Sequence, residues 1–271
     1  MLEVDAAGLT EPGPHRDTNE DAIGAFAPSG DARKGFLYVV ADGLGGHNAG
    51  EVASATAVQT LGHEYYSPSS HHRIEPALRQ AVQAANLRIH NLAHKHQQYA
   101  SMETTLTAVA LAGAHAYIAH IGDCRVYHWR EGRLTQLTSD HSEAAELVRM
   151  RLLKPERVRD HPGRNVLTRT LGSRLIPRPD YLRQPIEPGD RFVLCSDGAW
   201  SELDDAEFSQ VLEDCDPHTA CRELMQRVLA RECLDNVSLQ IIDVRQVEAE
   251  PPGGARNGWL SGIFQRGGGR T

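Results

Sequence analysis

Short apolar runs recur along the first 244 residues of the chain and define most of its expected fold. Six of them are rich in β-branched or aromatic residues and have the length of β-strands. They cover residues 36–41, 105–111, 116–121, 124–129, 190–196 and 236–244. Because only the short turns AGAH and GD separate the second, third and fourth runs, we predict that these three form an antiparallel meander.

Apolar residues at three-to-four-residue spacing predict two long helices, from Ala49 to about Tyr66 and from Ile74 to about Lys95. A further helical zone follows Asp204. Strands thus come in groups that are separated by groups of helices. This order indicates an α+β fold in which β-sheets pack on each other with helices outside, and it does not fit a regular βαβ alternation.

Two segments depart from this pattern. Residues 139–166 are polar and partly helical, and seven Lys or Arg lie between Arg149 and Arg169. The segment is either a solvated surface helix or a mobile flap that meets an anionic substrate. Residues 245–271 contain seven glycines and a Pro-Pro pair, a composition typical of a flexible tail. The apolar stretch 259–264 is either part of a spare tail or a docking motif for a partner or membrane surface.

The composition is that of a globular protein, since 40% of the 271 residues are hydrophobic and 24% are charged. The formal net charge of -8 disfavours nucleic acid as the main partner, because nucleic acids bind basic surfaces. The five cysteines are odd in number and lack metal-ligand spacing, so we expect reduced thiols and a cytoplasmic protein. We expect no signal peptide, no membrane span and a monomer, although no sequence signal addresses oligomeric state.

Acidic residues stand at the ends of several of these runs. Two runs end in Asp-Gly, one is followed by Gly-Asp, one begins after an aspartate, and a Glu-Asp pair precedes a strand-like segment. The acids are Asp42, Asp197, Asp123, Asp235, Glu20 and Asp21. Each of them alone is most simply a turn residue. Strand ends in packed sheets meet at one edge, however, and carboxylates gathered there repel each other unless a cation neutralises them.

The donor types in this cluster predict a hard divalent cation. Oxygen ligands without nearby His or Cys select Mg²⁺ or Mn²⁺ rather than zinc. Gly43 has no side chain, so its carbonyl oxygen can also approach a metal. Arg16, four residues before Glu20, is either an ion-pair partner of these acids or a bidentate ligand for phosphate. Two metals beside an arginine suit phosphoryl chemistry.

Seven sequence blocks occur in the order and spacing of a known family. They are RDTNED at 16–21, VVADGLGGHNAGE at 39–51, TTLTAVAL at 104–111, IGDCRVY at 121–127, NVLTRTLG at 165–172, FVLCSDGAW at 192–200 and DNVSLQII at 235–242. Through these blocks the chain resembles the PP2C (PPM) family of metal-dependent Ser/Thr protein phosphatases, and most closely its bacterial branch. The resemblance extends from about Glu3 to Val244.

The resemblance implies a β-sandwich of two antiparallel sheets flanked by helices on both faces. The phosphatase domain would cover residues 1–244, with 139–166 as its flap and 245–271 as a flexible tail. Two Mg²⁺ or Mn²⁺ ions, with a third position, would be bound. The implied roles are Asp42 bridging both ions, Gly43 giving its carbonyl, Asp197 and Asp235 holding one ion, Glu20 and Asp21 lying by the other, Asp123 joining Asp197 at the third position, and Arg16 binding phosphate.

The resemblance also implies the reaction and the partners. The reaction is hydrolysis of phosphoserine and phosphothreonine in proteins by in-line attack of a metal-bridging hydroxide, without a covalent intermediate. The partners are phosphorylated proteins and a Ser/Thr kinase that the enzyme opposes. Three alternatives are a metal-binding pseudophosphatase without catalysis, a two-metal phosphoesterase for small molecules, and a phosphatase of a sigma-factor antagonist system.

Three positions depart from the family pattern or lack a role in it. Leu44 stands where eukaryotic relatives have a histidine, so the proton donor to the leaving oxygen is open between His47 and a metal-held water. Glu103 stands where bacterial members often have glycine, which is expected to alter the local turn. Asp140-His141, which follow the fourth strand-like run, are a frequent pair in the family, and His141 is expected to be structural.

Overall fold

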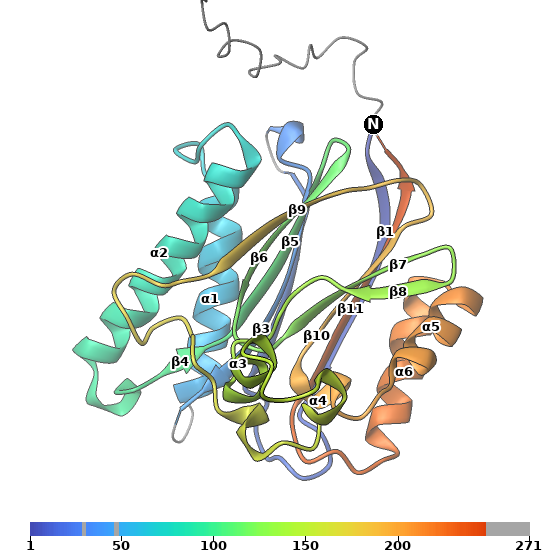
Figure 1. Ribbon diagram of the computed structural model, residues 1–271. Coiled ribbons are helices and arrows are strands. Elements are labelled where there is room, and N and C mark those ends of the chain that lie inside the picture. Colours follow the sequence, from blue (N-terminus) through green and yellow to red (C-terminus); the bar gives the residue numbers. More distant parts are fainter. Residues whose placement is uncertain (29–30, 46–48, 248–271) are drawn as a thin grey trace, which may run out of the picture.

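The computed structural model describes residues 1–28, 31–45 and 49–247, and these form two β-sheets packed face to face with helices outside each sheet (Figure 1). The predicted class and sandwich are therefore confirmed. The predicted tail beyond Val247 and His47 lie outside the described residues.

The first sheet has five strands, all paired antiparallel. Their spatial order is β1 (Glu3–Glu11), β11 (Val237–Gln246), β10 (Arg191–Cys195), β7 (Arg125–Arg130) and β8 (Arg133–Gln136). The outer face of this sheet is covered by α5 (Asp205–Asp214) and α6 (Pro217–Leu229). β11 continues two residues beyond the domain boundary that the sequence predicted at 244.

The second sheet has six strands, again antiparallel. The order is β2 (Asp21–Phe26), β3 (Phe36–Leu44), β5 (Leu106–Ala112), β6 (His115–Ile121) and β9 (Asp180–Pro185), with the short β4 (Glu103–Thr104) pairing with the end of β3. Its outer face is covered by α1 (Ala49–Tyr66) and α2 (Ile74–Lys95), as the periodicity predicted. Two short 3₁₀ helices, η1 (Ala32–Lys34) and η2 (Gln97–Tyr99), lie in the connections.

Both faces of the central strands are buried, which is why their sequences are apolar without interruption. In β3, Leu37, Val39 and Ala41 pack against α1 and α2, whereas Tyr38 and Val40 face the other sheet. The same alternation occurs in β10. Three apolar layers result, one between the sheets and one under each pair of helices, and they hold the strand ends in fixed positions.

The predicted meander is wrong at its third strand. β5 and β6 pair as expected, but β7 lies in the other sheet, beside β10. The Gly-Asp turn between β6 and β7 is thus a crossing between sheets. Gly122 adopts a φ of +109°, where a Cβ would lie 2.5 Å from Thr105, so only glycine fits this corner. The crossing delivers Asp123 to the space between the two sheets' ends.

The polar segment 139–166 forms a small lobe rather than a single surface helix. It contains α3 (Glu143–Arg149), η3 (Pro155–Arg157) and η4 (Pro162–Asn165). Its two ends are joined by a bridge between Ser142 and Leu167, so that the lobe begins and ends at the same place on the sandwich.

Two general features complete the fold. Within the described ranges, no helix combines the length and the apolar character that crossing a bilayer requires. All five cysteines carry free thiols.

Candidate functional site

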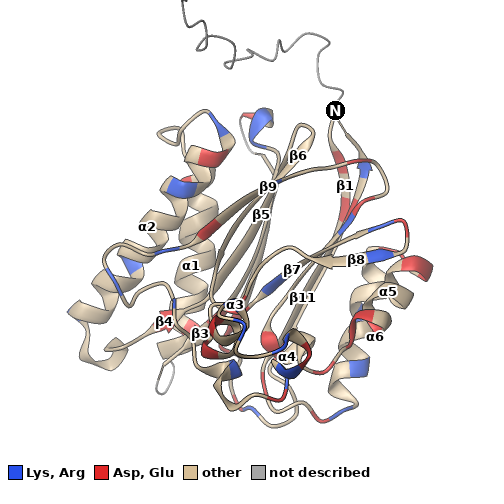
Figure 2. Cartoon of the chain, viewed as in Figure 1, with Lys and Arg blue, Asp and Glu red and all other residues tan. Residues whose placement is uncertain are grey.

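The predicted acidic residues meet at one end of the sandwich, around a cavity of about 220 Å³. In Figure 2 acidic residues (red) gather there, near the labels of β3 and α4 (Asp197–Trp200). Seven of the eight predicted site residues line this cavity, and they are Arg16, Glu20, Asp42, Gly43, Asp123, Asp197 and Asp235. The eighth, Asp21, is buried, and it is the cross-strand neighbour of Asp42 in the pairing of β2 with β3.

The end of β3 is clamped so that Asp42 points into the cavity. The Thr105 hydroxyl accepts a hydrogen bond from the Asp42 amide at 2.8 Å, and the Asp42 carbonyl accepts from the Thr105 amide and the Thr104 hydroxyl, both at 2.8 Å. Gly43 lies against the start of α1, where a Cβ would come within 2.0 Å of the Gly50 carbonyl oxygen. Glycine is therefore required by packing at this position.

Asn236 ties the loop before β2 to the strand that brings Asp235. Its side-chain oxygen accepts from the Glu20 amide at 2.8 Å, and its amide group donates to the carbonyls of Pro12 and Thr18, both at 2.9 Å. These three bonds join segments more than 200 residues apart. They place Glu20 opposite Asp235.

Hydroxyl and indole groups hold two further acids. The Ser196 hydroxyl donates to Asp21 at 2.7 Å and accepts from the Ser238 amide at 2.9 Å. The Trp200 indole donates to the Asp123 carbonyl at 2.9 Å. The carbonyl of Asp123 is therefore fixed, while one buried oxygen of its carboxylate has no hydrogen-bond partner.

Arg16 makes an ion pair with Asp235 at 2.8 Å and also donates to the Leu234 carbonyl at 3.0 Å. This is the ion-pair arrangement that the sequence left open. Its side chain is 43% exposed and lines the cavity, so the guanidinium stands at the mouth of the site. No histidine, lysine or tyrosine is among the described residues that line the cavity.

Crowding of buried carboxylates dominates the electrostatics of the site. Burial, and then the charges of Asp21, Asp197, Asp123 and Asp235, raise the pKa of Asp42 well above its usual range. Burial and the neighbouring Asp235 raise the pKa of Asp197 to about 7. Burial raises the pKa of Asp21 to about 6, although hydrogen bonds from serines oppose it. Such shifts mark charges that the surrounding protein does not neutralise.

The donor set fits a divalent cation. Asp21, Asp123 and Asp197 each have one buried carboxylate oxygen without a hydrogen-bond partner. A buried charge of this kind is stable only when a cation or donor approaches it. Oxygen donors of this hardness suit Mg²⁺ or Mn²⁺. In the described part of the chain, no three His, Cys, Asp or Glu side chains form a finished metal cage, so the fit rests on the donors and their unmet charge.

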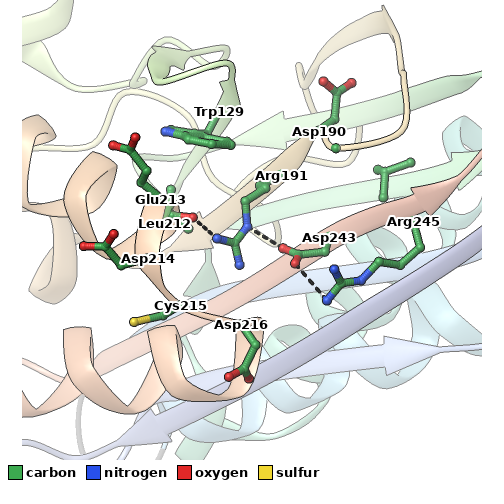
Figure 3. Close-up of a pocket in the computed structure, with 12 residues that line it drawn as sticks. Trp129, Asp190, Arg191, Leu212, Glu213, Asp214, Cys215, Asp216, Asp243 and Arg245 are labelled. Carbon is green, nitrogen blue, oxygen red and sulfur yellow. Dashed lines mark hydrogen bonds and ion pairs between the residues drawn. The ribbon is translucent and has the colours of Figure 1, made fainter.

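A larger cavity, of about 480 Å³, lies at the other end of β10 and has a different character (Figure 3). There Arg191 and Asp243, which are cross-strand neighbours on β10 and β11, form a buried ion pair at 2.5 Å. Asp190 pairs with Arg130 at 2.5 Å and lies 3.2 Å from a ring nitrogen of His128. We refer to this region as the distal cavity. The buried aspartates there have cationic partners from the same chain.

Sequence reasoning missed the residues that position the acids. Thr104, Thr105, Ser196 and Trp200 lie inside the quoted blocks, but nothing in their spacing shows which backbone group each one contacts. Asn236 follows Asp235 directly and stands at the start of an apolar strand. A polar residue in that position is the one sequence signal that could have indicated its role. His141, expected to be structural, is fully buried and accepts from the Gly122 amide at 3.1 Å.

Comparison with known proteins gives a consistent result. The sequence model of protein phosphatase 2C matches residues 15–234. The chain is 34% identical over 245 residues to a putative protein phosphatase 2C-type of Streptococcus pyogenes, covering 89% of this chain and 98% of that protein. It is 33% identical over 239 residues to the serine/threonine protein phosphatase PstP of Mycobacterium tuberculosis, covering 88% of this chain and 44% of that protein.

Solved structures agree with the sequence comparison. The crystal structure of the M. tuberculosis serine/threonine phosphatase PstP/Ppp superimposes with a TM-score of 0.82 at 31% identity, covering 91% of this chain and all of that one. A structure of the PstP catalytic domain in complex with two manganese ions gives a TM-score of 0.80 at 30% identity, with 91% of this chain and all of that one covered.

Proposed function

Because the chain belongs to the protein phosphatase 2C family, a family of metal-dependent Ser/Thr protein phosphatases, we propose that its carboxylate-lined cavity hydrolyses phosphoserine and phosphothreonine in proteins. The observation that carries this proposal is the cavity itself. Acids from five separate segments converge there with one arginine, and their own chain leaves most of their charge unpaired.

We propose that the site holds two ions of Mg²⁺ or Mn²⁺, with a third position. Asp42 would bridge the two, with the Gly43 carbonyl beside it, and Asp197 and Asp235 would hold one ion. Glu20 and Asp21 would lie by the other, and Asp123 would join Asp197 at the third position. When bound, such ions supply Lewis acidity toward phosphoryl oxygens and activate water for attack on phosphorus.

The chain's own residues bind and orient the substrate. Arg16 stands at the mouth with a planar fork of donors, and this geometry matches two oxygens of a phosphoryl group. Its present partner, Asp235, is 38% exposed, so exchange of the carboxylate for a phosphate requires only a side-chain movement. Arg16 then stabilises the charge on the phosphoryl oxygens in the transition state.

The proton for the leaving oxygen comes from a different source than in relatives with a histidine after Asp-Gly. Leu44 occupies that position and lines the cavity with an apolar side chain. We propose that a water in the cavity supplies the proton. His47 is the alternative and lies outside the described residues.

Three further assignments belong to this proposal. Residues 1–244 are the phosphatase unit, and 139–166 form its flap, whose last turn brings Asn165 to the cavity. The substrates require a Ser/Thr protein kinase to form the phosphoesters that the enzyme removes. The enzyme acts as a monomer in the cytoplasm. Light scattering on the purified protein tests whether it is a monomer.

The test is hydrolysis of a phosphothreonine peptide by the full chain. Activity should be absent after chelation, return with Mn²⁺ or Mg²⁺, and be missing in Asp197→Ala under both conditions. Asp214→Asn, which removes one carboxylate from the distal cavity, is the matched control and should behave as the unaltered protein does. Metal-independent turnover, or full activity in Asp197→Ala, would refute the proposal.

A further inference from the structure

A second hollow, of about 250 Å³ and opposite charge, lies beside the carboxylate-lined cavity. We call it the basic pocket. Its walls include three arginines and three hydroxyl side chains, which are Arg169, Arg174, Arg178, Thr168, Thr170 and Ser173. The ten residues from Arg169 to Arg178 contain no acid.

The basic pocket and the catalytic cavity share the same two stretches of backbone. Leu167 lines the catalytic cavity, and the next residue, Thr168, lines the basic pocket. Likewise Asp123 lines the catalytic cavity and Ile121, two residues earlier, lines the basic pocket. The two hollows therefore adjoin each other along both stretches of backbone.

The positive charge of the basic pocket is largely unneutralised. Arg174 and Arg178 are exposed, and in the described part of the chain neither side chain makes a hydrogen bond or an ion pair. Arg169 forms an ion pair with Asp180 at 3.1 Å. The one carboxylate that lines the pocket, Glu146, is paired with Arg149. Although the net charge of the chain is -8, two unpaired arginines in one hollow create a local positive potential that attracts anions.

The loop that carries these arginines is held rigidly against α2, beside which it passes in Figure 1. The side-chain amide of the fully buried Asn86 donates to the carbonyls of Arg174 at 2.9 Å and Leu175 at 3.2 Å, and its oxygen accepts from the Gly172 amide at 2.9 Å. Gln83 donates to the Leu175 carbonyl at 3.1 Å. A loop fixed in this way presents its arginines without an ordering cost for its backbone on binding.

Glu103 provides a second anchor for the same loop. Its carboxylate accepts a hydrogen bond from the Thr170 hydroxyl, which also bonds to the hydroxyl of Ser173 at 2.9 Å. The acid that departs from the family pattern therefore fixes the wall of the basic pocket. It does so from β4, directly beside the catalytic end of β3.

We propose that the basic pocket binds a second phosphoryl group of the same substrate, a few residues from the phosphate that is hydrolysed. The guanidinium forks of Arg174 and Arg178 are groups of the kind that recognise a phosphate dianion. The one acid that lines the pocket, Glu146, is paired with Arg149, and the Glu103 carboxylate behind Thr170 already accepts the hydroxyl of that residue. This inference rests on the proposed function, and it makes the enzyme selective for proteins phosphorylated at two nearby positions.

The test compares peptides that differ only in the second anion. All carry one phosphothreonine, and at two, three or four positions to either side, roughly 7 to 14 Å along an extended chain, they carry alanine, glutamate or a phosphonate analogue of phosphoserine. The phosphonate cannot be hydrolysed, so turnover reports the phosphothreonine alone. We expect the phosphonate at the best spacing to raise kcat/KM about tenfold over alanine, through KM, with glutamate giving much less.

Variants then locate the effect. In Arg174→Gln/Arg178→Gln the ratio of kcat/KM for phosphonate and alanine peptides should fall to near one. The matched control, Arg88→Gln/Arg133→Gln, removes two exposed arginines elsewhere and should keep the full ratio. An equal fall in both double variants would reduce the effect to net charge and overturn the inference. Glutamate as effective as phosphonate would overturn the assignment to phosphate.

Failure of this inference and failure of the proposed function give different results. If the alanine peptide is hydrolysed with metal but no second anion changes kcat/KM at any spacing, only the basic pocket is wrongly assigned. If no peptide is hydrolysed, the proposed function fails, and the affinity for the phosphonate peptide still tests the pocket. Equal affinity in the unaltered protein and in Arg174→Gln/Arg178→Gln would then contradict it.

Discussion

The two ends of β10 treat buried aspartates in opposite ways. At the distal cavity, Asp190 and Asp243 each have an arginine from the same chain within 2.5 Å. At the catalytic end, Asp42, Asp123 and Asp197 crowd together, and Arg16 makes its ion pair with Asp235. Burial acts to raise the pKa of Asp190, but the adjacent His128 and Arg130 outweigh it and lower that pKa to about 2. Burial and neighbouring acids raise the pKa of Asp197 to about 7.

This difference separates acids that stabilise the fold from acids that serve a ligand. At the distal end each of the two buried aspartates has an arginine partner. The buried side-chain atoms left without a hydrogen bond there are nitrogens of Arg191, His128 and Trp129, which do not attract a cation. A buried cluster of carboxylates without cationic partners binds a cation that neutralises their charge. The fold tolerates their mutual repulsion because apolar layers on both sides hold the strands in place. The distal cavity is the larger of the two, but its two buried aspartates already have arginine partners, so size alone does not identify the metal site.

The largest expected effect comes from breaking the catalytic cluster. Asp42→Asn should lower kcat on a phosphothreonine peptide by about a thousandfold or more, because it removes the central carboxylate of the cation site. The same change should raise the stability of the metal-free protein, because folding no longer has to bury a carboxylate or bind a proton to neutralise it. Turnover assays and urea denaturation in the presence of chelator measure the two effects. A metal-free variant less stable than the parent would contradict the second.

Breaking the ion pair at the distal cavity should lower stability and leave activity unchanged. Asp243→Ala leaves Arg191 buried without its partner and should lower the free energy of unfolding by about 3 kcal/mol. The specific activity of the folded protein should be retained, because the pair lies at the far end of β10. Glu75→Ala, which breaks an exposed ion pair on α2, is the control and should cost at most about 0.5 kcal/mol. An equal loss in the free energy of unfolding in both variants would mean that burial does not explain the contribution of the distal pair to stability.

Asp197 and Asp190, at opposite ends of β10, should also show opposite pH dependence. Asp243 does not share the behaviour of Asp190, because burial raises its pKa despite the ion pair with Arg191. Asp197 and Asp21 have folded-state pKa values raised above those of the unfolded chain, so the folded state binds more protons and metal-free stability falls as pH rises from about 4 to 7. Asp190, with its pKa lowered to about 2, adds stability that is present above pH 4 and is lost as pH falls through 2. Urea denaturation with chelator between about pH 5 and 8 should show a decline that Asp197→Asn flattens. A rise over that range would contradict the account.

The smallest expected effect comes from a residue that only positions the acids. Asn236→Ala removes three hydrogen bonds that join the loop before β2 to β11 and should weaken metal affinity about tenfold. Activity at saturating metal should largely return, which distinguishes positioning from coordination. Asn91→Ala, at an exposed position of α2, should change neither property. Loss of activity that no metal concentration restores would assign Asn236 a direct part in catalysis.

The sequence predicted the catalytic end better than the distal end, for a physical reason. Asp42, close to the end of β3, and Asp197, just after β10, interrupt apolar runs, and such an interruption can be recognised from the sequence alone. Arg191 and Asp243 lie inside strand segments, and their pairing depends on the register between β10 and β11, which the hydrophobic pattern does not contain. The misassigned β7 has the same origin, since periodicity gives the faces of a strand but not its neighbours.

The measurement that tests the central claim most directly is calorimetric titration of the metal-free protein with Mn²⁺. It would compare the unaltered chain with Asp197→Asn at the catalytic end and Asp214→Asn at the distal cavity, the same substitution at two aspartates. The unmet carboxylate charge at the catalytic end predicts that the unaltered protein and Asp214→Asn bind Mn²⁺ alike, while Asp197→Asn binds at least about tenfold more weakly. Equal affinity in all three proteins, or no binding by the unaltered chain, would contradict the assignment of the catalytic end as the cation site.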